Sequence, residues 1–223
     1  MPKVKLIKPL PQVREEIKDD GFYRVSISDY VSDYLKESSK IALKIDQKVI
    51  KKIIDELYRA WKENKNVFLM GNGGSATIAM HFMNDWGKGT FTEGKDRLKT
   101  ICLVENTDLV TALVNDNGWE NLYIDQIKGW IKKGDLLVGF SVHGGSGADK
   151  AGAWSQNMLK AYQYAKEVGA ATIGFSGYDG GVMRTLCDLC LVVPGYTTGH
   201  VQDAHVAVSH IIGNVLAQKL KSS

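Results

Sequence analysis

The sequence has little proline and cysteine, no large charge excess of either sign and no long hydrophobic run. Only four of its 223 residues are Pro and three are Cys. An odd number of cysteines argues against the disulfide framework of a small secreted protein. No apolar run approaches the roughly 18 residues that cross a bilayer, and the first residues lack the apolar core of a signal peptide. We therefore expect a cytoplasmic protein that does not bind membranes.

The charge balance also makes nucleic acid an improbable partner. There are 28 Lys and Arg against 25 Asp and Glu, for a net charge of +3. Nucleic-acid-binding proteins usually concentrate basic residues on one face, and no stretch here interleaves Lys or Arg with exposed aromatic residues. With 44% hydrophobic residues, the composition is that of an ordinary globular protein that needs no cross-links.

Two of the cysteines form a C-x-x-C pattern, Cys187 and Cys190. A redox or zinc pair normally lies at the start of a helix or beside a second pair. These two instead lie in a stretch that alternates and then becomes continuously apolar, as in a strand. We interpret them as buried cysteines of a strand.

The hydrophobic pattern predicts a doubly wound α/β fold. Residues 1–27 show no sustained period and are interpreted as an N-terminal extension, and residues 28–223 as one domain that begins with two helices, 28–44 and 45–64. Strand-like runs then alternate with helical segments, which is typical of parallel strands joined by crossover helices. The expected strands are 67–70, 99–104, 135–142, 170–176 and 188–193, and the later helices start near 75, 108, 147, 180 and 200.

In such sheets, ligands bind beyond the carboxyl ends of the strands, and the first candidate loop there contains Asn72, Gly73, Gly74 and Ser75. Its glycines permit close backbone approach, and the N-terminus of the following helix favours an anion. The loop lacks the Lys of a Walker A sequence and the third glycine of a dinucleotide fingerprint. A phosphate or polyhydroxyl ligand is one interpretation, and a tight turn without a ligand is the other.

A second loop contains Ser141, Val142, His143 and Ser146, and it also follows a strand. Hydroxyl groups, backbone N–H groups and a helix dipole can bind a phosphate monoester without a lysine or a metal. We predict a phosphate between Ser141 and Ser146. A third Gly-rich loop, 176–181, is interpreted as a structural connection.

Two helices carry histidines that suggest acid–base or metal chemistry. His81 and Asp85 lie four residues apart on one helix face, and the last helix carries His205 and His210 on different faces. A His–Asp pair joined by a second histidine fits a divalent metal or an acid–base cluster. For His205 the alternative is a histidine that only packs between helices.

Taken together, these motifs resemble the sugar isomerase (SIS) domain family, and most closely its phosphoheptose isomerase branch. The resemblance rests on Gly-Asn-Gly-Gly-Ser followed by His81, on Ser-x-His-Gly-Gly-Ser, and on Gln202 with His210 eight residues later. It implies a zinc site formed by His81, Asp85, Gln202 and His210. It also implies that the substrate is bound at Asn72, Gly73, Gly74, Ser75, Glu105, Asn106, Ser141, Val142, His143, Ser146 and Gln202.

The activity implied by the resemblance is aldose–ketose isomerisation of a phosphosugar, either sedoheptulose 7-phosphate or a related sugar phosphate. Such a reaction needs a base and an acid, and Asp85 and His210 are the candidates. The alternative is a non-catalytic phosphosugar-binding regulator or a tetrameric scaffold of the kind associated with a replication initiator. The resemblance further implies a homotetramer with sites between subunits, and we expect the apolar stripe Val49, Ile53, Leu57 and Trp61 to contribute to it.

Overall fold

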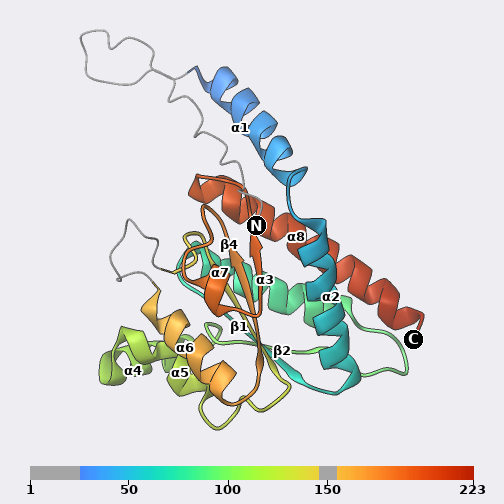
Figure 1. Ribbon diagram of the computed structural model, residues 1–223, viewed down its shortest axis with the longest axis vertical. Coiled ribbons are helices and arrows are strands. Elements are labelled where there is room, and N and C mark those ends of the chain that lie inside the picture. The colour runs from blue at the N-terminus through green and yellow to red at the C-terminus, as the bar shows by residue number, and fades with distance from the viewer. Residues whose placement is uncertain (1–25, 146–154) are drawn as a thin grey trace.

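The computed structural model describes residues 26–145 and 155–223, and it contains a five-stranded parallel sheet between two layers of helices (Figure 1). The strands are β1 (Asn66–Gly71), β2 (Lys99–Cys102), β3 (Leu136–Ser141), β4 (Ala171–Ser176) and β5 (Leu189–Val192). Their order across the sheet is β2-β1-β3-β4-β5, and every neighbouring pair is parallel. The predicted doubly wound α/β class and its five strands are confirmed.

Alternate side chains of each strand supply two separate hydrophobic cores. Leu69 points to a core formed with the end of α1 (Ile27–Ala42), α2 (Gln47–Lys62), α3 (Gly74–Gly89) and α8 (Thr198–Lys221). Its neighbour Met70 points to the opposite core, formed with α5 (Leu122–Ile127), α6 (Gln156–Glu167) and α7 (Met183–Leu186). This two-sided burial explains why the central strands β1 and β3 are mostly apolar, whereas the edge strand β2 begins with Lys99 and Thr100.

The stripe on α2 belongs to the core of the chain itself. The side chain of Asp46 caps the helix by accepting from the N–H groups of Lys48 and Val49. Ile53 and Leu57 are completely buried, and Trp61 packs against the same core. The inner part of the stripe is thus covered within the chain by the sheet and α8, while Val49 and Trp61 are half-buried, and its contribution to a subunit interface stays a prediction.

Two of the helical segments that connect strands differ from the prediction, the one after β2 and the one after β3. After β2 the chain forms α4 (Thr107–Asn117), a 3-10 turn (Trp119–Asn121) and α5 where one helix was expected. The break falls at Gly118, whose φ of +83° ends the helical conformation. The helix expected near residue 147 is represented by α6, which begins at Gln156. Ser146 and the other residues up to 154 lie outside the described part of the chain.

The C-x-x-C cysteines are enclosed, as expected, although only one belongs to a strand. Cys187 follows the last residue of α7 and Cys190 lies in β5, with both sulfurs next to Gly174 of β4. Burial raises the pKa of both thiols, so they remain protonated near neutral pH. This supports the structural interpretation.

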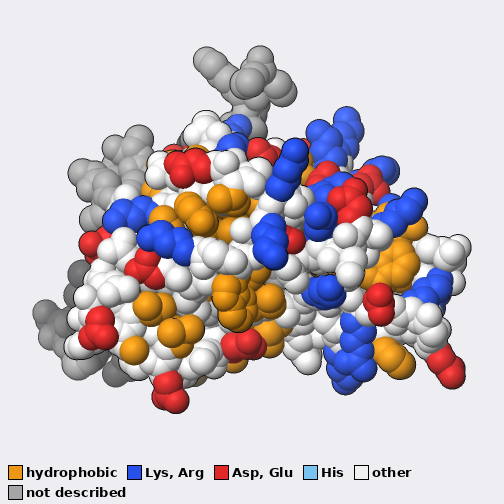
Figure 2. Space-filling view, turned by 90° about the horizontal axis from the view of Figure 1, so that it is seen from below, with side chains coloured by type: hydrophobic (Ala, Val, Ile, Leu, Met, Phe, Trp, Pro, Cys, Tyr) orange, Lys and Arg blue, Asp and Glu red, His pale blue; other side chains and the backbone are white. Residues whose placement is uncertain are grey.

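The charged surface is mixed rather than concentrated. On the face seen from the lower side of Figure 1, Lys and Arg side chains are interspersed with Asp and Glu around apolar patches (Figure 2). Among the helices of residues 26–145 and 155–223, none is both long and apolar enough to cross a membrane.

Candidate functional site

The strand order reverses direction between β1 and β3, which places the first and second Gly-rich loops beside each other. In doubly wound sheets, this switch point is where a crevice opens beyond the strands. Gly73 caps α3 with φ +56° and ψ −127°, a conformation available essentially only to glycine. Ser75 is buried, and its N–H donates to the carbonyl oxygen of Asn72 at 3.0 Å. The first loop therefore ends at the exposed N-terminus of a 16-residue helix.

The second loop is tightly folded where it is described. Ser141 is buried and its Oγ accepts from the N–H of Gly145 at 3.3 Å, while the Val142 carbonyl accepts from the N–H of Gly177 at 2.9 Å. The ring of His143 lies 4.3 Å from that of Tyr178 in the third loop. The third loop thus packs against the second, in agreement with its structural interpretation.

Two residues that sequence reasoning missed, Ser155 and Asn157, lie against the first loop. Ser155 is the residue that precedes α6, and its Oγ lies 3.5 Å from Asn72 Nδ2. Asn157 is completely buried in the first turn of α6 and bonds to the Asn72 side chain. No local pattern in the sequence indicates these contacts, because Ser155 makes no side-chain cap of α6 and both residues meet Asn72 only through the tertiary fold.

Three side chains from α3 and α8 converge in a second part of the site. His81 Nε2 lies 3.0 Å from His210 Nε2 and 3.1 Å from Asp85 Oδ2, and the His210–Asp85 distance is 3.5 Å. Ser209 Oγ donates to the same carboxylate oxygen at 3.4 Å. The side chain of His210 is 54% exposed. A groove of about 310 Å³ between α3 and α8 borders Asp85 and His210.

The donor set of this cluster fits a zinc ion. Two imidazole nitrogens and one carboxylate oxygen lie within 4.8 Å of one another. Tetrahedral zinc with bonds of about 2.0–2.1 Å places its ligand atoms roughly 3.3 Å apart, close to the three separations observed. The same three groups also suit proton transfer, because imidazole and carboxylate both exchange protons at ordinary pH.

Other predicted residues lie elsewhere or have other contacts. The amide of Gln202 packs against Gly74, seven residues before His81 on α3. Asn106 caps α4, with its Oδ1 accepting from the N–H of Leu109 at 3.0 Å. Glu105 is exposed just after β2.

His205 lies in a different environment from His210. It is completely buried, and its Nε2 lies 3.3 Å from the carbonyl oxygen of Ser176. Burial lowers the pKa of His205 to about 4, so the ring is neutral at physiological pH. The geometry agrees with the packing role expected for this histidine.

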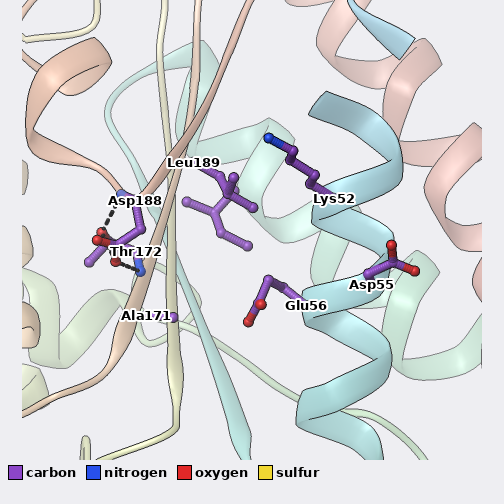
Figure 3. A pocket seen from close by; sticks show the side chains of 8 residues that line it. Lys52, Asp55, Glu56, Ala171, Thr172, Asp188 and Leu189 are labelled. Carbon is purple, nitrogen blue, oxygen red and sulfur yellow. Dashed lines mark hydrogen bonds between the residues drawn. The ribbon is translucent and has the colours of Figure 1, made fainter. Parts of the chain in front are cut away.

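A separate hollow of about 340 Å³ lies between α2 and the first residues of β4 and β5 (Figure 3). It is at the amino ends of the strands, opposite to the Gly-rich loops. Its acidic groups already have partners: Asp55 bonds to Lys51 and Lys219, and Asp188 to Lys166 and Thr172. We therefore assign the candidate site to the crevice and the α3–α8 cluster alone.

The fold and these loops define a sugar isomerase class of α/β protein, and comparison with known proteins agrees. Residues 30–177 match the SIS domain family, to which the chain belongs. Phosphoheptose isomerase 2 of Campylobacter jejuni is 35% identical over 165 residues, 74% of this chain and 77% of that protein. A phosphoheptose isomerase of Clostridium acetobutylicum is 36% identical over 162 residues, 73% of this chain and 78% of that one.

Solved structures show the same fold. The structure of a phosphoheptose isomerase from Francisella tularensis superposes with a TM-score of 0.77 at 21% identity, covering 87% of this chain and all (100%) of that one. Phosphoheptose isomerase GmhA from Neisseria gonorrhoeae superposes with a TM-score of 0.75 at 24% identity, covering 89% of this chain and 100% of that one.

Proposed function

We propose that the protein is a phosphosugar aldose–ketose isomerase, with sedoheptulose 7-phosphate as its first candidate substrate. The observation that carries the proposal is the convergence of His81, Asp85 and His210 from two helices beside a groove. Relatives that are about 35% identical and bear the name phosphoheptose isomerase support the choice of sugar phosphate.

The phosphate group is assigned to the crevice between the Gly-rich loops. Two helices, α3 and α6, begin there, and helix N-termini favour an anion. Ser155 lies beside the start of α6 and adds a hydroxyl to the proposed site, while Ser146, which the sequence suggested, lies outside the described residues. The backbone of Gly73 and Gly74, together with Ser75, Ser141, Val142 and His143, forms the rest of the proposed binding surface. Glu105 and Asn106 extend it beyond β2, and Gln202 extends it over Gly74.

Asp85 and His210 are assigned to the proton transfers. Isomerisation removes a proton from the carbon next to a carbonyl and returns one to the former carbonyl carbon, through an enediolate. The carboxylate and the imidazole lie 3.5 Å apart, so one can act as base while the other, protonated, acts as acid. Asp85 directs Oδ2 toward both histidines, which leaves Oδ1 for the substrate side.

A zinc ion is part of the proposal because the donor set fits one. His81, Asp85 and His210 would hold it, and Gln202, whose amide lies against Gly74, is the proposed fourth ligand. Zinc bound there would polarise the sugar carbonyl and its adjacent hydroxyl.

A homotetramer and a cytoplasmic location complete the proposal. The first half of α1 exposes apolar side chains on one face, Ile27, Tyr30, Val31 and Leu35, with Leu35 63% exposed. Ile211 and Val215 are also exposed on α8 next to His210. Burial of these groups by further copies of the chain would exclude water from the cluster. The three free cysteines fit a reducing compartment.

The test is incubation of the purified protein with five- to seven-carbon ketose phosphates, with and without a chelator, followed by measurement of aldose phosphate. We expect turnover of sedoheptulose 7-phosphate above that of shorter sugars. If no ketose phosphate is isomerised but one binds, the protein is instead a phosphosugar-binding regulator or scaffold, and the catalytic assignment is wrong.

A further inference from the structure

The side chain of Asn72 already has four hydrogen-bonding contacts within the protein. Its Oδ1 lies 3.0 Å from Tyr123 Oη and accepts from Asn157 Nδ2 at 3.0 Å. Its Nδ2 donates to Asn157 Oδ1 at 3.0 Å and to Ser155 Oγ at 3.5 Å. The Tyr123 hydroxyl has only one proton and donates it at a shorter distance, 2.5 Å, to the carbonyl oxygen of Gly71. The firm hydrogen bonds of the Asn72 side chain are therefore the two that pair it with the Asn157 amide.

The partners of Asn72 are firmly held. Tyr123 and Asn157 are both completely buried. The Tyr123 hydroxyl also contacts the carbonyl oxygen of Gly71, and burial raises the pKa of this hydroxyl, so it remains a donor at any ordinary pH. Asn157 Oδ1 further accepts from the N–H of Met158 at 2.9 Å. Rotation of the Asn72 amide toward a ligand would leave buried polar groups unpaired, which is costly.

The paired amides join two segments that are 85 residues apart in the sequence. Asn72 directly precedes Gly73 and the first turn of α3, and its carbonyl accepts from Ser75. Asn157 lies in the first turn of α6. The two bonds between the amides therefore fix the spacing of the two helix N-termini that flank the crevice.

We infer that Asn72 acts with Asn157 as a positioning pair, supported by Tyr123, that holds the N-termini of α3 and α6 at a fixed separation. This inference rests on the proposed function for the identity of the ligand in the crevice. It adds a positioning role to the substrate contact that the family resemblance implies at Asn72.

The first test is a double-mutant cycle on kcat/KM with sedoheptulose 7-phosphate. We expect Asn72→Ala and Asn157→Ala each to lower kcat/KM roughly ten- to a hundredfold, because small displacements of binding groups have effects of this size. The kcat/KM of the double variant should lie no more than about threefold below that of the less active single variant, because both substitutions break the same pair of hydrogen bonds. Losses that multiply would show that Asn72 acts on the substrate independently, and would overturn the inference.

The second test needs no activity and therefore separates this inference from the proposed function. Hydrogen–deuterium exchange of peptides covering residues 71–78 should be faster in Asn157→Ala and in the nearly isosteric Tyr123→Phe than in the unchanged protein. The matched control is Tyr162→Phe, which removes another buried hydroxyl that bonds instead to the carbonyl of Ile173 at 2.8 Å. Unchanged exchange in both test variants, with thermal midpoints that show folded protein, would refute the positioning role even if the enzyme is an isomerase.

Discussion

The Nε2 atoms of His81 and His210 lie 3.0 Å apart, although the two residues are separated by 129 positions in the sequence. Two neutral imidazoles can face each other at this distance only if one nitrogen carries a proton and the other does not. A cation ligated by both nitrogens is the alternative arrangement. In both arrangements the two rings interact directly with each other and with the Asp85 carboxylate, which lies 3.1 Å from His81.

Replacement of His210 should abolish turnover and leave the fold intact. His210→Gln is expected to lower kcat by about a hundredfold or more, since an amide cannot transfer a proton near neutral pH. The side chain is 54% exposed, so the thermal midpoint and phosphate binding should change little. The test measures turnover at saturating substrate and the thermal midpoint of His210→Gln. Lys88→Gln, which changes another residue of the same groove, is the control. Near-normal turnover of His210→Gln would remove the acid–base assignment and favour a binding protein.

His205 should instead affect stability, and in a pH-dependent way. Its pKa is about 4 in the folded protein against 6.5 as the ordinary value, so the unfolded chain binds the extra proton first. Stability should therefore fall as the pH drops from 6.5 toward 4, by up to about 3 kcal/mol from this group. We expect His205→Gln to lower the free energy of unfolding while changing the turnover rate little. It should also reduce the dependence of the unfolding free energy on pH. Denaturant titrations of both proteins at pH 4.5, 5.5 and 7 measure the unfolding free energy and its pH dependence. If the unfolding free energies of the two proteins change with pH by the same amount, His205 is not the buried neutral group that we infer.

Phosphate affinity should depend on Ser155. Ser155 lies at the start of α6 and beside the first loop, where a hydroxyl can donate to an anion at the helix N-terminus. Ser155→Ala should raise the dissociation constant of the sugar phosphate by roughly tenfold, corresponding to about 1.4 kcal/mol. Calorimetric titration of Ser155→Ala and Ser146→Ala in parallel tests this. A loss confined to Ser146→Ala would show that Ser155 does not bind the phosphate.

Zinc should bind at one equivalent per chain. Removal of metal with a chelator, followed by titration with zinc, should show binding with proton release and a higher thermal midpoint. His81→Ala should weaken zinc binding by about a hundredfold or more, whereas His143→Gln, in the second loop, should not. Equal zinc affinity in all three proteins would show that the metal, if bound, lies elsewhere.

The tetramer should depend on α1. Light scattering should give a mass near four times 24.6 kDa, and Leu35→Glu should reduce it because a charge would enter the apolar face of the helix. Lys36→Glu changes the charge of the same helix next to that face and serves as control. A monomer at micromolar concentration in the unchanged protein would refute the shared-site arrangement.

Much of this architecture could be predicted because it depends on local patterns. Runs rich in apolar and β-branched residues, bounded by Gly, Asn or Asp, located all five strands, and the spacing of His81 and Asp85 placed them on one face of α3. The helix breaks were harder to predict. One glycine, Gly118, divides a segment that reads as a single helix, and its positive φ is not evident from composition.

The sequence by itself determined the fold class, the Gly-rich loops at the strand ends and the candidates for the acid–base side chains. Tertiary structure alone decided which of them meet. Helices α3 and α8 pack in parallel, which brings His210 to His81 and leaves Gln202 against Gly74. Ser155 and Asn157 reach Asn72 because β1 and β3 are neighbours in the sheet. Such contacts depend on strand order and helix packing, which join residues far apart in the chain and leave no periodic signal in the sequence.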